Sequence, residues 1–279
     1  MEDSKFKYLG KRSTIIDGPE KLMGKAHYAG DLSFPNMLHV KLFLSEHAHA
    51  KVVHVNKEHA LKIPGVKAVF TAEDLTQWKH VSASRIGALL ARGEAVFAGH
   101  PIAAVVGDSP EAASDGLSCI EVDYEILPVV SDIEKALCKD APLVWEKGIP
   151  RDESDVSSEH ADVDKKNEDF KDLPRNVHSQ NLTSHGNVEN AFKKADLVLE
   201  RVYKTAAVHQ GYLEPQNCVV VPDLNHELTI YTSTQGPKSV HKDVARLLNL
   251  PFKKIRVVPM VVGGGFGGKH GLLEPTAAA

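Results

Sequence analysis

Apolar and polar residues alternate in short runs through the first half of the chain, at the spacing that is typical of β-strands. The runs that predict strands cover residues 38–44, 51–55 and 66–70. Short helical segments are expected between and after them, at 57–61 and from Thr71 onward, where the Thr71 side chain can cap the first turn. This pattern predicts strands and helices interleaved along the chain.

A further unit follows. The uninterrupted apolar run 102–106 is typical of a strand that is buried on both faces. Residues 108–111 have the features of a helix start, with a proline in the first turn and an acid near the positive end of the helix. Apolar residues then alternate with polar ones over 120–124, so we expect a β-α-β unit. Together these elements predict a mixed α/β domain over residues 1–150.

Residues 151–175 differ in character from the rest, because nine Asp and Glu residues crowd a segment with almost no apolar periodicity. Such a segment buries too little apolar surface to offset the entropy of ordering it. We therefore interpret it as an acidic linker, and we expect proteases to cut there first. A partner-binding acidic tail is the alternative, which is less favoured because periodic sequence resumes on both sides.

Residues 176–279 form the second predicted domain. A short helix is expected at 187–192, followed by strands at 197–203 and 228–231. Apolar residues then recur at helical spacing over 239–249, which predicts an amphipathic helix packed on the sheet.

A glycine-rich segment, Gly263-Gly264-Gly265-Phe266-Gly267-Gly268-Lys269, follows directly on an apolar run. Its glycines remove most Cβ atoms, so backbone amides can approach a bound group closely. A phosphate loop of the Walker type requires Ser or Thr after the lysine, and His270 stands there. A dinucleotide fingerprint requires a helix, a strand and an acid about 20 residues further on, which the sequence does not supply before Ala279.

Two interpretations of this loop remain open from the residues alone. The ring of Phe266 amid glycines suggests a side chain placed against a cofactor, with the surrounding amides as donors. A glycine-rich turn around a packed Phe266 is the alternative. The helix expected over 239–249 joins Gln235 to this loop, which would bring two polar contact points to one end of the sheet.

Several motifs stand in order along the chain: GKAHYAGD at 24–31, SEHAHA at 45–50, HQGYLEPQ at 209–216, STQGP at 233–237, Leu250-Pro251, IRVV at 255–258 and the glycine-rich loop. This order resembles the family of molybdenum-binding large subunits of xanthine dehydrogenase, aldehyde oxidase and carbon monoxide dehydrogenase. The resemblance covers about residues 10–279, apart from a weak stretch near 151–175.

The resemblance implies a fold and a function. The fold is an α/β hammerhead-like domain followed by the beginning of a molybdopterin-binding domain. The function is that of a hydroxylase that oxidises an aldehyde, an N-heterocycle or carbon monoxide with oxygen derived from water. Its cofactor would be molybdenum-molybdopterin, in the cytosine dinucleotide form. An iron–sulfur subunit with [2Fe-2S] clusters, an FAD subunit, and a chain or segment that supplies the rest of the molybdopterin domain are the implied partners.

The same resemblance assigns site residues. Gln235 corresponds by motif to a glutamine that hydrogen-bonds near the molybdenum oxo group, and Gly264, Gly265, Phe266 and Gly267 to the loop against the metal centre. A neutral amide and backbone N–H groups can stabilise an oxo ligand without adding a charge. No residue here is expected to ligate the metal directly. No catalytic base is assigned, since the family's glutamate belongs to a motif several hundred residues further on.

The sequence also departs from the family's pattern. Purine-hydroxylating members carry a glutamate where this chain has His270, so xanthine is disfavoured as substrate and His270 is a candidate substrate-binding residue. Large subunits of the family are more than twice this long, which implies a truncated or split chain. The alternative to a catalytic part is a non-catalytic subunit that gives structure and cofactor contacts only with a partner chain.

Composition narrows the class further. A net charge of -4 without a concentrated basic face argues against nucleic-acid binding. Cys119, Cys138 and Cys218 form no C-x-x-C pair, which fits a reducing cytoplasm and excludes a four-cysteine cluster in this chain. The N-terminus has no apolar signal-peptide core, and no membrane span is indicated. His47 and His49 would share one face of a strand, and a surface or interface pair is favoured over a metal site because no third ligand is near.

Overall fold

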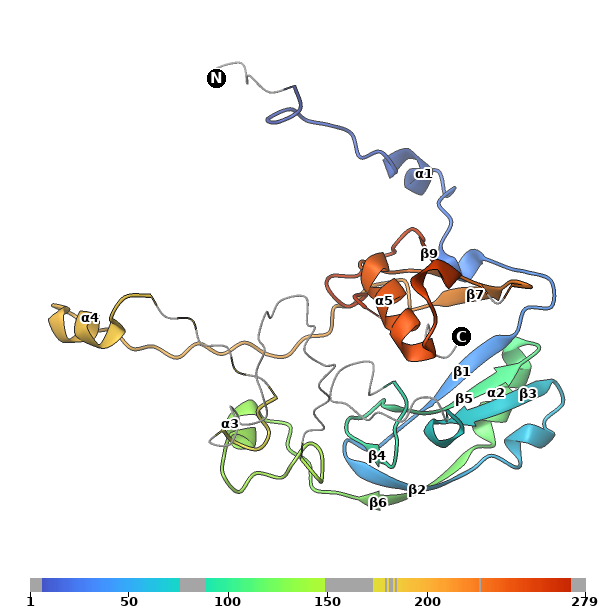
Figure 1. The fold of residues 1–279 in the computed structure, drawn as a ribbon, viewed down its shortest axis with the longest axis horizontal. Helices are drawn as coiled ribbons and strands as arrows, with labels where there is room; N and C mark the ends of the chain where they lie inside the picture. The colour runs from blue at the N-terminus through green and yellow to red at the C-terminus, as the bar shows by residue number, and fades with distance from the viewer. Residues whose placement is uncertain are drawn as a thin grey trace.

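The computed structural model describes residues 7–75, 89–148, 173–178, 180, 183, 185–225 and 227–271. Its strands form three separate three-stranded sheets. Two belong to the N-terminal unit, drawn from blue to green in Figure 1, and one to the C-terminal unit, drawn in orange. The segment expected to be an acidic linker lies almost wholly outside the described residues, so the linker and its proteolysis stay predictions.

The N-terminal unit is built from two antiparallel sheets. The first has the order β1-β5-β3, with β1 at His39–Leu44, β5 at Pro101–Gly107 and β3 at Val66–Thr71. The second has the order β4-β2-β6, with β4 at Glu94–Ala95, β2 at Ala50–Asn56 and β6 at Glu121–Ile126. The central strand β5 is buried along almost its whole length, as its continuous apolar run predicts.

Two hydrophobic clusters fill this unit, and they share Phe43, Val55 and Val122. Helix α2, at Pro110–Ser118, packs against β1 and β5. Its start is as expected, because the Ser109 hydroxyl accepts a hydrogen bond from the Ala112 amide at 3.0 Å. The expected β-α-β unit is wrong, however. Strand β6 leaves the sheet of β5 and pairs antiparallel with β2, and a two-residue period does not specify which sheet a strand joins.

Short helices complete the framework. They are α1 at Gly18–Leu22, η1 at Ala29–Asp31, η2 at Ala60–Lys62, η3 at Ala72–Asp74, α3 at Ile133–Ala136 and η6 at Phe252–Lys254. The turn expected after Thr71 is present as η3, where Thr71 and Asp74 form a reciprocal capping box. None of the described helices has the length and apolar character that crossing a membrane requires.

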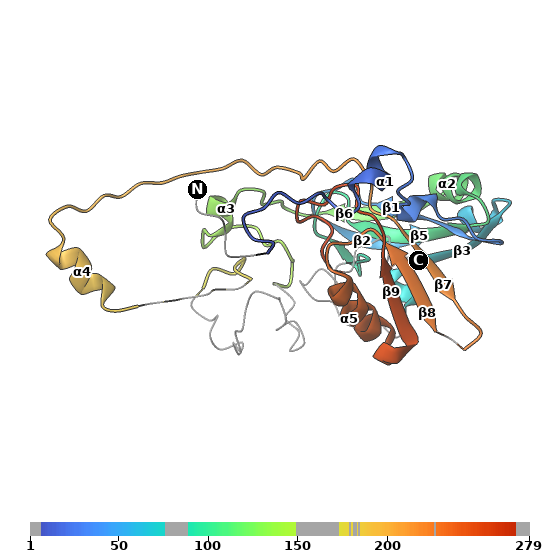
Figure 2. The ribbon, with the colours of Figure 1, turned by 90° about the horizontal axis from the view of Figure 1, so that it is seen from above.

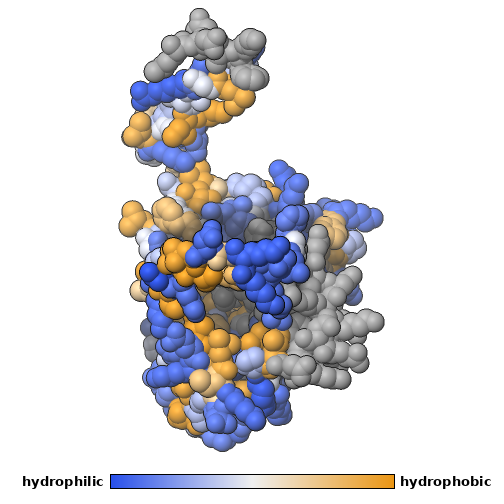
Figure 3. Space-filling model, turned by 90° about the vertical axis from the view of Figure 1, so that its left-hand side faces the viewer, coloured by the Kyte–Doolittle hydropathy of each residue, from blue (hydrophilic) through white to orange (hydrophobic). Residues whose placement is uncertain are grey.

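Helix α4, at Val188–Lys194, and the segment 195–212 extend away from the sheets as one arm (Figure 2). The strand expected at 197–203 is wrong, because this stretch is extended but hydrogen-bonds to no neighbouring strand and is exposed. A strand needs a partner for its ladder, which propensity alone does not provide. Figure 3 looks onto this end of the molecule, where hydrophobic side chains lie exposed among hydrophilic ones.

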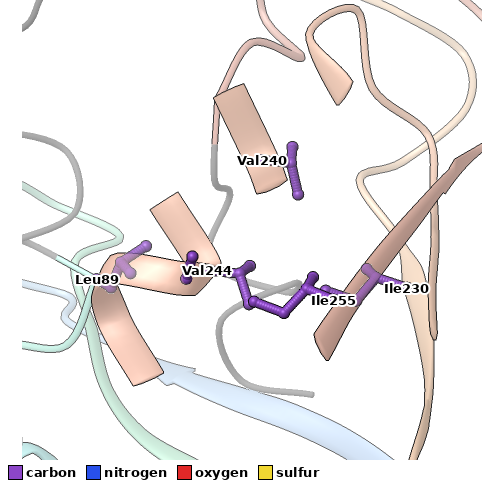
Figure 4. Close-up of a cluster of buried hydrophobic side chains, with 6 residues drawn as sticks. Leu89, Ile230, Val240, Val244 and Ile255 are labelled. Carbon is purple, nitrogen blue, oxygen red and sulfur yellow. The ribbon is translucent and has the colours of Figure 1, made fainter. Parts of the chain in front are cut away.

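The C-terminal sheet has the order β7-β8-β9, with β7 at Cys218–Pro222, β8 at Leu228–Thr232 and β9 at Ile255–Pro259. Strands β8 and β9 are parallel and are joined by helix α5, at Pro237–Leu248. The expected amphipathic helix is thus confirmed. Its Val240 and Val244 pack on Ile230 of β8 and Ile255 of β9 (Figure 4). Leu89 of the N-terminal unit joins the same cluster, so the two units share a buried contact.

Candidate active site

The β8-α5-β9 crossover brings the predicted site residues together. The carboxyl ends of parallel strands lie at the same edge of a sheet, and ligands of such units bind there. Gln235 follows the end of β8, and the glycine-rich loop follows the end of β9. The amides of Gly267 and Lys269 both donate to Gln235 Oε1, at 3.0 and 3.4 Å. The expectation that Gln235 and the loop meet at one end of the sheet is therefore confirmed.

These two hydrogen bonds fix the orientation of the Gln235 amide. Because both partners are N–H donors, the atom that they share must be the carbonyl oxygen. The Nε2 group has no hydrogen-bond partner among the described residues, and Gln235 is exposed. Gly265 makes this contact possible, since a Cβ there would lie 2.5 Å from Gln235 Oε1. The arrangement presents a neutral N–H donor beside the loop.

Phe266 and Gly267 form the exposed tip of the loop. Phe266 has a φ of 48°, in the left-handed region that is unfavourable for a bulky residue, and the residue is 72% exposed. Gly267 has a φ of 84°, and a Cβ there would meet nothing within 4 Å. The side of the tip at Gly267 is thus open, while the Gly267 amide is held by its hydrogen bond to Gln235.

A buried ion pair lies beneath the loop. The Lys269 side chain is 0% exposed, and its Nζ donates to Glu214 Oε2 at 2.7 Å and to Ser233 Oγ at 3.0 Å. Glu214 Oε2 also accepts from Ser233 Oγ and from the Gly263 amide, each at 2.6 Å. Burial raises the pKa of Glu214, but the hydrogen bonds from Lys269, Ser233 and Gly263 outweigh it and hold that pKa below 4.5.

Sequence reasoning did not connect these residues. Glu214 stands out as an acid before a proline, and Lys269 as the last residue of the loop, but they are far apart in the chain. A lysine amid glycines that has no phosphate-loop partner is a signal that could have prompted a search for a buried counter-charge. Glu214 Oε2 already accepts three hydrogen bonds, and the expectation that no residue here is the catalytic base stays a prediction.

His270 is exposed, and its ring lies beside Gly236, the residue that precedes α5. Its Nδ1 is 3.0 Å from the place that a Cβ of Gly236 would occupy. The neighbouring backbone is tightly bonded, since the Gln235 amide donates to the Lys269 carbonyl at 2.8 Å. His270 is thus placed close to Gln235 in the chain's fold, and its role in substrate binding stays a prediction.

His47 and His49 lie in different surroundings. His49 lies in a bend just before β2 and is 5% exposed, so it is not the surface residue that one of the two expected alternatives required. Its Nε2 lies 2.7 Å from Glu94 Oε1 and its Nδ1 2.7 Å from the Pro128 carbonyl. His47 stacks edge-on against Tyr124 instead. Among the described residues, no group of three or more His, Cys, Asp and Glu side chains could hold a metal ion.

A hollow of about 620 Å³ lies on the arm, between α4 and the segment that follows it. Its lining is mostly apolar, with Phe192, Leu197 and Leu199 among the contributors. None of the predicted site residues lines it. We therefore place the site at the glycine-rich loop.

Comparison with known proteins agrees with this geometry. One family model, the aldehyde oxidase and xanthine dehydrogenase a/b hammerhead domain, matches residues 23–128. A second, the molybdopterin cofactor-binding domain, matches residues 170–279 and so includes both Gln235 and the loop. The chain belongs to the xanthine dehydrogenase, aldehyde oxidase and carbon monoxide dehydrogenase large-subunit family. Its mixed α and β architecture is that of the family's hammerhead and molybdopterin-binding domains.

Individual relatives support the assignment. The chain is 30% identical to the nicotinate dehydrogenase large molybdopterin subunit of Eubacterium barkeri, over 95% of this chain and 56% of that protein. It is 31% identical to the carbon monoxide dehydrogenase large chain of Hydrogenophaga pseudoflava, over 90% of this chain and 30% of that one. The reconstituted carbon monoxide dehydrogenase from Oligotropha carboxidovorans superposes with a TM-score of 0.77 at 28% identity, over 97% of this chain and 33% of that one. The chain thus spans between 30% and 56% of the length of these relatives.

The residues present fit a molybdopterin at this edge of the sheet. The exposed Gln235 amide offers a donor without a charge, and the open side of Gly267 leaves room for a close approach to the backbone. The Glu214 carboxylate, which accepts from the Gly263 amide, is paired with the Lys269 ammonium. The loop therefore presents donors, and no free negative charge, to a bound group.

Proposed function

We propose that this chain supplies one part of the molybdopterin site of a hydroxylase that oxidises an aldehyde, an N-heterocycle or carbon monoxide with oxygen derived from water. The observation that carries the proposal is the pair of hydrogen bonds that Gln235 Oε1 accepts from the Gly267 and Lys269 amides. This contact joins the two segments that the family motif pairs with the metal centre, and it turns the Gln235 N–H donor outward.

The chain's own residues have distinct tasks in this proposal. Gln235 donates a hydrogen bond from Nε2 and orients the bound group. Gly267 allows the backbone to lie close to that group, and the exposed ring of Phe266 covers one side and limits access of water. Gly264 and Gly265 shape the loop from within, since they leave room for Tyr212 and Gln235 to pack against it. When bound, the molybdenum cofactor supplies the oxygen transfer to the substrate carbon and takes up two electrons.

His270 is proposed to face the substrate. An imidazole can donate or accept a hydrogen bond near neutral pH, whereas the glutamate of purine-hydroxylating members can only accept one when ionised. This difference disfavours xanthine. The catalytic base is proposed to come from outside these residues, since Glu214 is engaged in the buried ion pair.

The electrons taken up must leave through partners. We propose an iron–sulfur subunit with [2Fe-2S] clusters and an FAD subunit, because the three cysteines lie far apart in sequence and are free thiols. The molybdopterin is proposed to be the cytosine dinucleotide form, in a cytoplasmic complex. One relative is named as the gamma subunit of a dehydrogenase complex, which fits this proposal.

A second candidate is a non-catalytic part that gives structure and cofactor contacts only with a partner chain. The exposed apolar residues of the arm favour this possibility, since Leu197, Leu199 and Val202 lie uncovered by described residues. Assaying residues 1–279 alone against aldehydes, N-heterocycles and carbon monoxide, with an artificial electron acceptor, separates the two. Sustained turnover by the lone chain would show that it is catalytic, with Glu214 and Glu274 as the first acids to test as base.

The proposal is tested by molybdenum and pterin analysis of the tagged chain purified from its native host with whatever co-purifies. Gly267→Ala should lose most of the bound molybdenum, because a methyl group there enters the space left for the cofactor. Gly99→Ala is the matched control, since Gly99 has a φ of 88° and likewise meets nothing within 4 Å. Both variants should lose about 1–2 kcal/mol from backbone strain. Wild-type molybdenum in Gly267→Ala would contradict the proposed role of the loop.

A further inference from the structure

One carboxylate oxygen holds both ends of the glycine-rich loop. Glu214 Oε2 accepts from the amide of Gly263, the first residue of the loop, and from the ammonium of Lys269, the last. The Glu214 amide also donates to the Gly263 carbonyl at 3.2 Å. The loop is therefore closed at its base by a side chain from a segment that is remote in sequence, which precedes β7.

The ion pair is completely shielded on the side of the lysine. Lys269 Nζ also lies over the Tyr212 ring, 4.9 Å from its centroid. Burial of an ammonium without a counter-charge is strongly unfavourable, so the Glu214 carboxylate stabilises Lys269 in this buried position. Glu214 Oε1 is buried without a hydrogen-bond partner among the described residues, so its other oxygen carries all the contacts observed.

A serine next to a lysine can also be a nucleophile with its base, but these two do not have that arrangement. Ser233 is completely buried, and its hydroxyl donates to Glu214 while accepting from the Lys269 ammonium. Neither a free base nor access for a substrate is present. The three side chains form a clamp for the backbone.

We propose that Lys269 and Glu214 are positioning residues, which act with Ser233 to hold the glycine-rich loop in the geometry that receives the cofactor. This inference rests on the proposed function. Glu214 sets the two ends of the loop from below, and Gln235 Oε1 holds the amides of Gly267 and Lys269 from the side. The exposed tip, Phe266 and Gly267, has no hydrogen bond to Glu214, Lys269 or Ser233 among the described contacts. Its position is therefore set by the clamp at the base of the loop and by Gln235 at its side.

The test uses the full chain, tagged in its native host and purified with its partners. The variants are Lys269→Met, Glu214→Gln and the double variant Lys269→Met/Glu214→Gln. Each is measured for thermal unfolding, for molybdenum and pterin content per chain, and for amide hydrogen exchange in residues 263–271. Lys67→Met is the control, because Lys67 forms an exposed ion pair with Asp108 that is remote from the loop in the fold.

Each single variant leaves one buried charge without its partner, so it should unfold at a lower temperature and lose cofactor. The double variant restores neutrality and should regain most of the thermal stability. Its loop should still exchange about 10- to 100-fold faster than wild type, because the charged hydrogen bonds are lost. Its molybdenum content should stay low. Recovery of both stability and cofactor in the double variant would overturn the inference, since the pair would then serve folding alone.

Ser233→Ala keeps both charges and is the change least able to disturb folding. It should speed exchange of the loop amides by about 2- to 10-fold, as expected for one lost hydrogen bond. Unchanged exchange together with unchanged cofactor content would overturn the inference. If wild type itself contains no molybdenum, the proposed function fails, whereas the exchange rates still decide whether the clamp positions the loop.

Discussion

The N-terminal unit and the C-terminal unit bury their apolar residues to different degrees. In the N-terminal unit, Ala103 and Val105 of β5 are completely buried between α2 and the second sheet. The C-terminal sheet has α5 on one face, while the arm that leads into it exposes apolar side chains from Val188 to Leu213. The N-terminal unit therefore buries the apolar residues of its central strand within itself, whereas the arm leaves its apolar residues exposed.

The two units also differ in how they use buried charge. Among the described residues, the ion pairs that Lys and Arg form in the N-terminal unit stay partly exposed, as for Lys57 with Asp74, although His49 is buried against Glu94. The C-terminal unit instead buries Lys269 against Glu214 directly below the candidate site. A unit that only has to fold gains little from a buried ion pair, whereas such a pair can hold one particular backbone arrangement. The buried pair of the C-terminal unit therefore fits the positioning role proposed for it.

The comparison predicts the largest loss of stability for a charge placed in the buried core of the N-terminal unit. Val105→Asp should reduce the free energy of unfolding by more than about 4 kcal/mol, because Val105 is 0% exposed and the new carboxylate has no partner. Leu199→Asp, on the arm and 68% exposed, should change it by less than about 0.5 kcal/mol. Urea unfolding of both variants measures the difference. A large loss in Leu199→Asp would show that the arm is covered in the native protein.

A smaller effect is expected at the contact between the units. Leu89→Ala should lower the free energy of unfolding by about 2–4 kcal/mol, because Leu89 is 2% exposed within the cluster of Val240, Val244 and Ile255. Leu61→Ala, at a half-exposed position of the N-terminal unit, is the control and should cost less than about 1 kcal/mol. Equal losses in the two variants would mean that the units fold without this shared contact.

The smallest effect concerns pH. The pKa of Glu214 is lowered in the folded chain, so its contribution to stability is present above pH 4.5 and is lost as the pH falls through the folded value. Glu214→Gln should therefore flatten the decline in stability below pH 4.5 by about 1.5–3 kcal/mol, the size of a hydrogen bond to a charged group. The control is Asp74→Asn, at the exposed pair with Lys57, and should flatten it less. Denaturation at a series of pH values decides; identical profiles for wild type and Glu214→Gln would contradict the buried pair.

Periodicity alone determined most of the elements. The continuous apolar run of β5 and the helical spacing in α5 specified buried elements, because each periodicity matches one backbone geometry. The proline and the acidic residue at the start of α2 marked its first turn, since both preferences are local. The order of motifs also indicated that Gln235 and the glycine-rich loop belong to one site, and the parallel crossover places them at one edge.

Only the tertiary structure decided what depends on distant partners. Strand β6 joins β2 rather than the sheet of β5, and the segment 197–203 lacks a paired neighbour, because strand pairing is set by contacts that no local pattern encodes. The same holds for the clamp. No local pattern around Lys269 indicates that its partner is Glu214. The fold brings the two together, because a buried ammonium needs a counter-charge, and we propose that the pair holds the loop in shape.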